Sequence, residues 1–153
     1  MAKLKIGDIV EIPTEKGISY AQYTHTHKMY GALLRVLPGF FTERPDSWSK
    51  LVSSVEKFVI FFPLKAAVNQ KIFSIVANHS VPDASKAFPT FRAGVVNPET
   101  NKVGVWWLWD GEKEWRIDNL SKAQRKLPIR GVWNDTLLIE RIVSGWLPET
   151  DPT

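Results

Sequence analysis

The chain has 153 residues, of which 44% are hydrophobic and 24% are charged. These values are typical of globular proteins and exclude a disordered or fibrous chain. The net charge of +4 is mildly basic, and the absence of cysteine excludes a disulfide scaffold, a thiolate zinc site, an iron–sulfur cluster and a cysteine nucleophile.

The same numbers bound the organisation of the chain. A chain of this length buries enough surface to fold without staples, so we expect a single domain over residues 1–153. No apolar run approaches the ~20 residues that span a bilayer, so we expect no membrane association. We expect a cytoplasmic protein, because the N-terminal residues lack the apolar segment of a secretory signal and the lack of cysteine fits a reducing compartment.

Short segments of β-branched, aromatic and aliphatic residues dominate the first part of the chain. Residues 8–13, 18–26 and 33–37 have this composition, and prolines and glycines separate them. The pattern predicts three successive antiparallel strands. Such a beginning is typical of a strongly bent sheet or a small barrel.

The middle of the chain predicts one short helix and then more strands. Apolar residues recur at helical spacing within residues 44–54, which favours a short helix. Residues 57–64, 72–76 and 88–96 again read as strands.

Residues 103–117 contain four of the seven tryptophans around the turn dipeptide Asp110-Gly111. A loop of two or four residues places Trp107 and Trp109 on one face of this predicted hairpin. The opposite face, which we expect to lie in the core, then carries Trp106, Leu108, Trp115 and Lys113. A three-residue loop would instead group Trp107 and Trp109 with Trp115.

The last part of the chain is ambiguous between helix and strand. Residues 119–127 predict one or two helical turns. Residues 135–144 lie between a helix-capping Asn134 and Gly145, yet their β-branched content favours a strand, and we expect a strand. Residues 147–153 are polar and contain proline, which predicts a frayed tail. The expected fold is therefore mainly β, a strongly bent antiparallel sheet or small barrel with one or two short helices.

Residues that could support catalysis are scattered. His25 and His27 are two residues apart and would share a strand face, but a zinc site needs a third ligand, such as His79, and nothing in the sequence brings it near. No nucleophile elbow, phosphate-binding glycine loop or paired carboxylates occur. We therefore expect no metal site, no cofactor and no enzymatic activity.

The tryptophan face of the hairpin is the strongest candidate for binding a partner. Trp107 and Trp109 with Glu112, Glu114 and Arg116 have the composition of a protein–protein interface, an aromatic centre with a charged rim. The alternative is that the chain itself covers this face. A second alternative is a small barrel that stacks single-stranded nucleic acid on its aromatic rings, although the two glutamates would repel phosphates.

A series of strand and turn segments runs through the first two thirds of the chain. They are Ile6-Gly7-Asp8-Ile9-Val10, Ile12-Pro13, Gly17, Tyr20-Ala21-Gln22-Tyr23, Leu33-Leu34-Arg35-Val36, Phe61-Phe62-Pro63-Leu64 and Pro89-Thr90-Phe91-Arg92. This pattern resembles the immunity protein 26 family of bacterial polymorphic toxin systems. The resemblance implies a mostly β, non-catalytic cytoplasmic protein that binds a cognate protein toxin and blocks it. The matching positions are structural, so the resemblance implies no particular binding residue.

Overall fold

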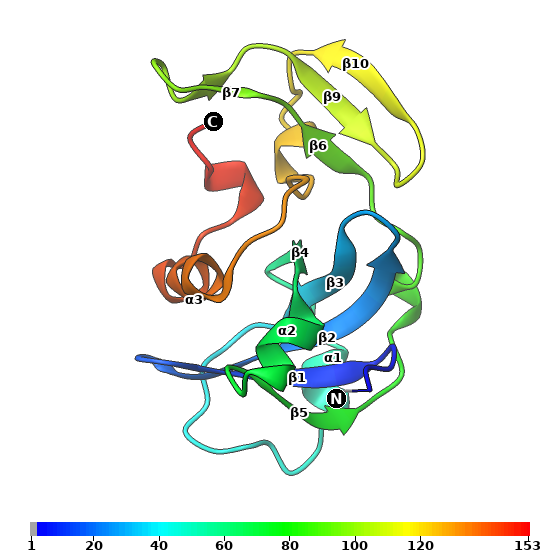
Figure 1. Cartoon of the computed structure of the whole chain (residues 1–153), viewed down its shortest axis with the longest axis vertical. Helices are drawn as coiled ribbons and strands as arrows, with labels where there is room; N and C mark the ends of the chain where they lie inside the picture. Colours follow the sequence, from blue (N-terminus) through cyan, green and yellow to red (C-terminus); the bar gives the residue numbers. More distant parts are fainter. Residues whose placement is uncertain (1–2) are drawn as a thin grey trace. The chain divides into compact units, whose positions relative to one another are not determined.

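The computed structural model of the chain describes residues 3–153 (Figure 1). These residues form two compact units. The first unit contains the described residues up to Ala87 together with Gly131–Gly145, and the second contains Phe88–Arg130 together with Trp146–Thr153. The single domain expected from the sequence stays a prediction, since two compact units can still fold as one.

The first unit is built on a five-stranded sheet in the order β4-β3-β2-β1-β5, and every neighbouring pair is antiparallel (Figure 1). The strands are β1 (Asp8–Thr14), β2 (Gly17–His27), β3 (Gly31–Val36), β4 (Phe58–Phe62) and β5 (Ser74–Asn78). This arrangement confirms the prediction of a mainly β fold with antiparallel sheets. Among the described residues the outer strands β4 and β5 do not pair with each other, so the sheet is open rather than a closed barrel.

Turn chemistry and bulges shape this sheet. Gly17 has a φ of +126°, a conformation that suits glycine, where the chain turns from β1 into β2. The register shifts between Ile9 and Val10 of β1 and between Tyr23 and His25 of β2. Such bulges bend a strand and increase its twist.

The core of the first unit combines the sheet with two short helices, α1 (Ser49–Val52) and α2 (Leu64–Asn69). Tyr20 is fully buried, and its ring meets Phe41 and Trp48 edge-on at centroid distances of 5.6 and 4.9 Å. A 3-10 turn, η1 (Asp83–Ser85), lies shortly before Ala87, where the chain leaves this unit.

Residues 135–144 form a helix, α3 (Asp135–Ser144), so the expected strand is wrong. The side chain of Asn134 accepts a hydrogen bond from the backbone N–H of Leu137 at 2.8 Å, and Gly145 ends the helix in the left-handed conformation. Leu138 and Ile142, four residues apart, are its buried residues, and α3 contacts β1. Capping and a buried apolar stripe outweigh the weak preference of β-branched residues for strands. No helix in the described part of the chain has the length and apolarity to cross a membrane.

The second unit contains a three-stranded antiparallel sheet in the order β10-β9-β6. Its strands are β6 (Phe91–Ala93), β9 (Trp106–Trp109) and β10 (Glu114–Asp118). A separate two-stranded ribbon joins β7 (Val96–Asn97) to β8 (Lys102–Val103), and two 3-10 turns follow, η2 (Gln124–Lys126) and η3 (Pro148–Thr150).

The C-terminal segment 147–153 is held in place by hydrogen bonds, so the expected frayed tail is also wrong. The buried guanidinium of Arg92 donates to the carbonyl of Pro148 at 2.6 Å and lies 5.0 Å from the centre of the Trp106 ring. Arg125 donates to the carbonyl of Asp151 at 2.9 Å. Burial is the main reason that the pKa of Arg92 lies below its ordinary value, with a smaller contribution from the charge of Arg125.

Candidate protein-binding surfaces

The predicted hairpin exists, and it has the four-residue loop that keeps Trp107 and Trp109 on the same face. Trp109 pairs with Glu114, and Trp107 pairs with Arg116. The side chain of Asp110 accepts hydrogen bonds from the backbone N–H groups of Glu112 and Lys113, at 3.0 and 2.9 Å. These bonds hold the pKa of Asp110 below its ordinary value and fix the loop.

Trp109 is only 6% exposed, so at this residue the alternative that the chain itself covers the face is the one observed. Its ring packs against Phe88 and Phe91, at centroid distances of 5.7 and 5.4 Å. The guanidinium of Arg130 covers the ring at 5.3 Å. The second unit therefore seals this indole beneath its own chain, and Trp109 has no surface to offer to a partner or to a nucleic-acid base.

For the other large apolar residues of the hairpin, exposure follows the position of the strand in the sheet and not the face on which the side chain lies. β9 is the central strand of the small sheet, and Trp106 and Leu108 are buried as expected, while Trp107 is half-buried. β10 is an edge strand, and its Trp115, expected in the core, is 42% exposed. A strand with neighbours on both sides is better covered than an edge strand.

Charged residues of the predicted site pair with neighbours within the second unit. Glu114 accepts from Arg130 at 2.9 Å, and this is the arginine that covers Trp109. Arg116 donates to Asp118 at 2.6 Å, and Glu112 is exposed at the loop. The structure thus brings Trp109 and Glu114 together through Arg130. Trp107, Glu112 and Arg116 remain predicted partner-binding residues. Because Trp109 is buried, it does not join Trp107 in an exposed aromatic centre.

A second candidate surface, which sequence reasoning missed, is a hollow of about 710 Å³ on the first unit. It lies where β2 ends, β3 begins and β4 passes into α2. Met29, in the turn between β2 and β3, is 76% exposed there. Its lining includes Leu4, Lys28, Met29, Phe62, Lys65 and Val132.

One sequence feature pointed to this hollow, but it was not enough to predict the hollow. Lys28-Met29-Tyr30-Gly31 is a turn with a large apolar residue at its tip, where polar residues are usual. Val132 reaches the hollow only because the chain returns to the first unit after residue 130, and it forms a parallel bridge with Phe61. No local pattern predicts that return.

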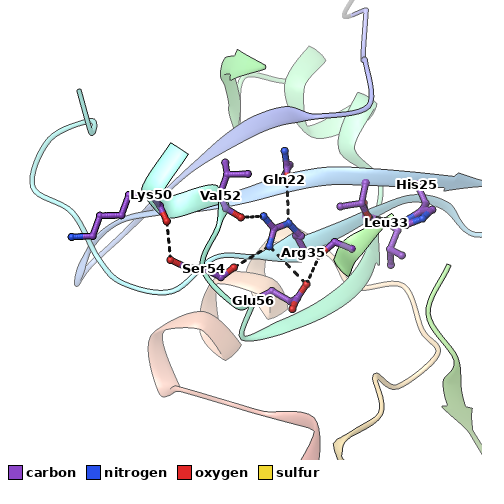
Figure 2. Close-up of polar contacts among 10 residues, drawn as sticks. Gln22, His25, Leu33, Arg35, Lys50, Val52, Ser54 and Glu56 are labelled. Carbon is purple, nitrogen blue, oxygen red and sulfur yellow. Dashed lines mark hydrogen bonds and ion pairs between the residues drawn. The ribbon is translucent and has the colours of Figure 1, made fainter. Parts of the chain in front are cut away.

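A buried polar network anchors the strands that lead to the hollow (Figure 2). Arg35 of β3 is almost fully buried and donates to the side chain of Gln22 at 2.9 Å, to the carbonyl of Ser54 at 3.2 Å and to the carbonyl of Val52. Its guanidinium lies 3.8 Å from the carboxylate of Glu56. Burial lowers the pKa of Arg35, and Glu56 opposes that shift. All three bonds go to the protein's own groups, which indicates a structural role.

The histidines considered as metal ligands use ring nitrogens in contacts with the protein's own groups. Nε2 of His25 lies 2.8 Å from the carbonyl of Lys86, and Nδ1 of His27 accepts from the N–H groups of Met29 and Tyr30 at 3.1 and 3.3 Å. The third candidate, His79, contacts the adjacent carbonyl at 2.9 Å. Among residues 3–153, no three histidine, aspartate or glutamate side chains are grouped as a metal site requires.

Ser49 and His79 form a serine–histidine contact of the kind found in catalytic pairs. The hydroxyl of Ser49 lies 3.3 Å from Nε2 of His79. A nucleophile and its base usually approach more closely than this and sit in a site that excludes water. Ser49 is exposed, so the contact reads as a surface hydrogen bond.

Comparison of the chain with protein-family models finds no matching family, and comparisons with curated proteins and with solved structures find no match either. The resemblance to the immunity protein 26 family therefore depends on the strand and turn residues quoted above.

Proposed function

We propose that this chain is a non-catalytic cytoplasmic protein that neutralises a cognate bacterial toxin by binding it directly. Two independent lines support the proposal. One is the resemblance of its strand and turn residues to the immunity protein 26 family. The other is the exposed apolar surface around the hollow of the first unit.

The observation that carries the proposal is the exposure of large apolar side chains around a concave surface. Met29 is 76% exposed and Val132 is 52% exposed, and both line the hollow. Contiguous apolar surface of this kind marks interaction sites. Methionine is favoured there, because its unbranched and polarizable side chain adapts to a partner.

The protein-binding function also agrees better with the aromatic residues than nucleic-acid binding does. A protein that stacks bases needs exposed ring faces. Trp109 is covered by Phe88, Phe91 and Arg130, and Tyr30 at the hollow stacks on Phe61 with a centroid distance of 5.2 Å.

The experiment reads the frames next to this chain's gene and co-expresses the chain in a bacterial host with any toxin-like polypeptide encoded there. We expect the chain to restore growth and to co-purify with that polypeptide as a stable complex. Restored growth without a complex would contradict direct binding. Neither rescue nor a complex would overturn toxin neutralisation as the function.

A further inference from the structure

We infer that the hollow of the first unit accepts an acidic polypeptide segment that carries an apolar side chain. The inference rests on the proposed protein-binding function and adds the chemistry of the partner. It follows from two properties of the hollow: an apolar interior and a rim whose formal charges are all positive.

The interior is suited to an aliphatic or aromatic side chain. Phe62 and Leu64 form its buried side, while Met29, Ala66 and Val132 remain accessible. A volume of about 710 Å³ exceeds that of a single side chain and lies within the range of sites that enclose a small ligand. A short segment with one apolar anchor therefore fits better than one isolated group.

The charges around the hollow have one sign. Lys28 and Lys65 both line it and are exposed, and none of the lining residues is aspartate or glutamate. Neither lysine forms an ion pair with any residue in the described part of the chain. Leu4, also in the lining, lies between Lys3 and Lys5 in the sequence. Carboxylates beside the apolar anchor would complement this rim and speed association.

Nucleic acid is also acidic, but the hollow lacks what its bases would need. The aromatic residues of the lining are engaged within the first unit. Tyr23 and Phe62 are buried, and the Tyr30 ring stacks on Phe61. An acidic peptide uses the apolar interior and the lysine rim together, whereas a phosphate backbone would use the rim alone.

The test is titration of the isotope-labelled full chain with nine-residue peptides, followed by NMR chemical shifts. The peptides share a central leucine and differ only in flanks of glutamate, serine or lysine, and oligothymidine serves as the nucleic-acid probe. We expect the glutamate peptide to shift the amide signals of Met29 and Lys65. It should bind about fivefold more tightly than the serine peptide at low salt, since exposed ion pairs are individually weak. Added salt should remove this advantage.

Two charge-reversal variants distinguish the effect of the rim lysines on peptide preference from the effect of the chain's net charge. The double variant Lys28→Glu and Lys65→Glu should prefer the lysine peptide. The matched control, Lys50→Glu and Lys57→Glu, changes exposed lysines of the same unit outside the hollow and should keep the preference for glutamate.

The outcomes distinguish the two levels of the proposal. Equal binding of all three peptides at the hollow would overturn the acidic partner and leave protein binding intact. Two other results would overturn both the acidic partner and the hollow as a protein-binding surface. One is that oligothymidine, but no peptide, shifts the signals of Met29 and Lys65. The other is that no probe shifts them.

Discussion

Arg35 shows how one buried side chain organises the first unit. Its three hydrogen bonds join Gln22 of β2 to the carbonyls of Val52 and Ser54, which follow each other closely at the end of α1 (Figure 2). A buried cation is stable only when its donors are used. The network therefore ties the helix end to the centre of the sheet.

Replacing Arg35 by methionine keeps the apolar stem and removes all the donors. The acceptors of Gln22, Val52 and Ser54 are then left without this partner, and a buried unsatisfied group costs about 1–3 kcal/mol. We expect Arg35→Met to lower the free energy of unfolding by about 2–4 kcal/mol in urea denaturation. The exposed Lys57→Met serves as the control and should stay within about 0.5 kcal/mol of the unchanged protein. A similarly small effect for Arg35→Met would show that the network adds no stability.

Tyr20 gives the first unit a dependence on alkaline pH. Burial, and then the hydrogen bond that its hydroxyl donates to Glu11 at 3.1 Å, raise its pKa from 10.0 to about 12. The folded state therefore holds this proton more tightly than the unfolded state does. The resulting stability is complete below pH 10 and is lost as the pH rises through about 12.

Two pKa units correspond to about 3 kcal/mol, so we expect the free energy of unfolding to fall by up to that amount between pH 10 and 12. Tyr20→Phe should cost about 1 kcal/mol at pH 7, because it removes one hydrogen bond, and should lose this alkaline step. The check is denaturant unfolding of both proteins across that pH range. An identical alkaline decrease in Tyr20→Phe would assign the step to another group.

The hairpin of β9 and β10 shows what sequence can and cannot predict for an element. The Asp110-Gly111 turn predicted the hairpin but left the loop length open, and the structure has the four-residue loop, which pairs Trp109 with Glu114. Exposure depended on facts outside the hairpin: β6 pairs with β9, and Phe88, Phe91 and Arg130 cover Trp109. Periodicity identifies the two faces of a strand but not which neighbours will cover them.

The same limit explains the other element-scale errors. The sequence of α3 carried both a helix cap at Asn134 and a strand-like composition, and packing of Leu138 and Ile142 decided for the helix. The C-terminal segment looked polar and free, but the distant Arg92 holds Pro148. Local strand patterns in the first 65 residues were reliable, because turns and alternation alone define them.

Truncation of the hairpin tryptophans distinguishes core from surface. Trp109→Ala removes a buried ring with three packed neighbours and should destabilise the protein by about 3–5 kcal/mol. Trp107→Ala, at a half-buried position, should cost clearly less and keep cooperative unfolding. Thermal unfolding of both variants is the measurement. If Trp107→Ala is the more damaging change, the burial described for the two rings is contradicted.

At the scale of the whole molecule, the chain passes between its two units three times, since residues 131–145 return to the first unit before the C-terminus joins the second. This return brings Val132 to the hollow and supplies α3 to the sheet of the first unit. Local sequence patterns cannot predict a surface whose lining comes from four separate parts of the chain, at residues 4, 23–32, 62–69 and 132. The absence of cysteine nevertheless excluded disulfides, thiolate metal sites and a cysteine nucleophile before the fold was known.

The most direct test of a protein-binding hollow is the affinity of two matched variants for the polypeptide that co-purifies with the chain, measured by titration calorimetry. Met29→Asp places a carboxylate in the hollow, and Val55→Asp makes the same change at an apolar residue of the first unit that is 81% exposed and outside the hollow. We predict that Met29→Asp weakens binding about tenfold or more, as expected for loss of an interface anchor, while Val55→Asp leaves the affinity within about twofold. Equal, unchanged affinity for both variants would contradict the account.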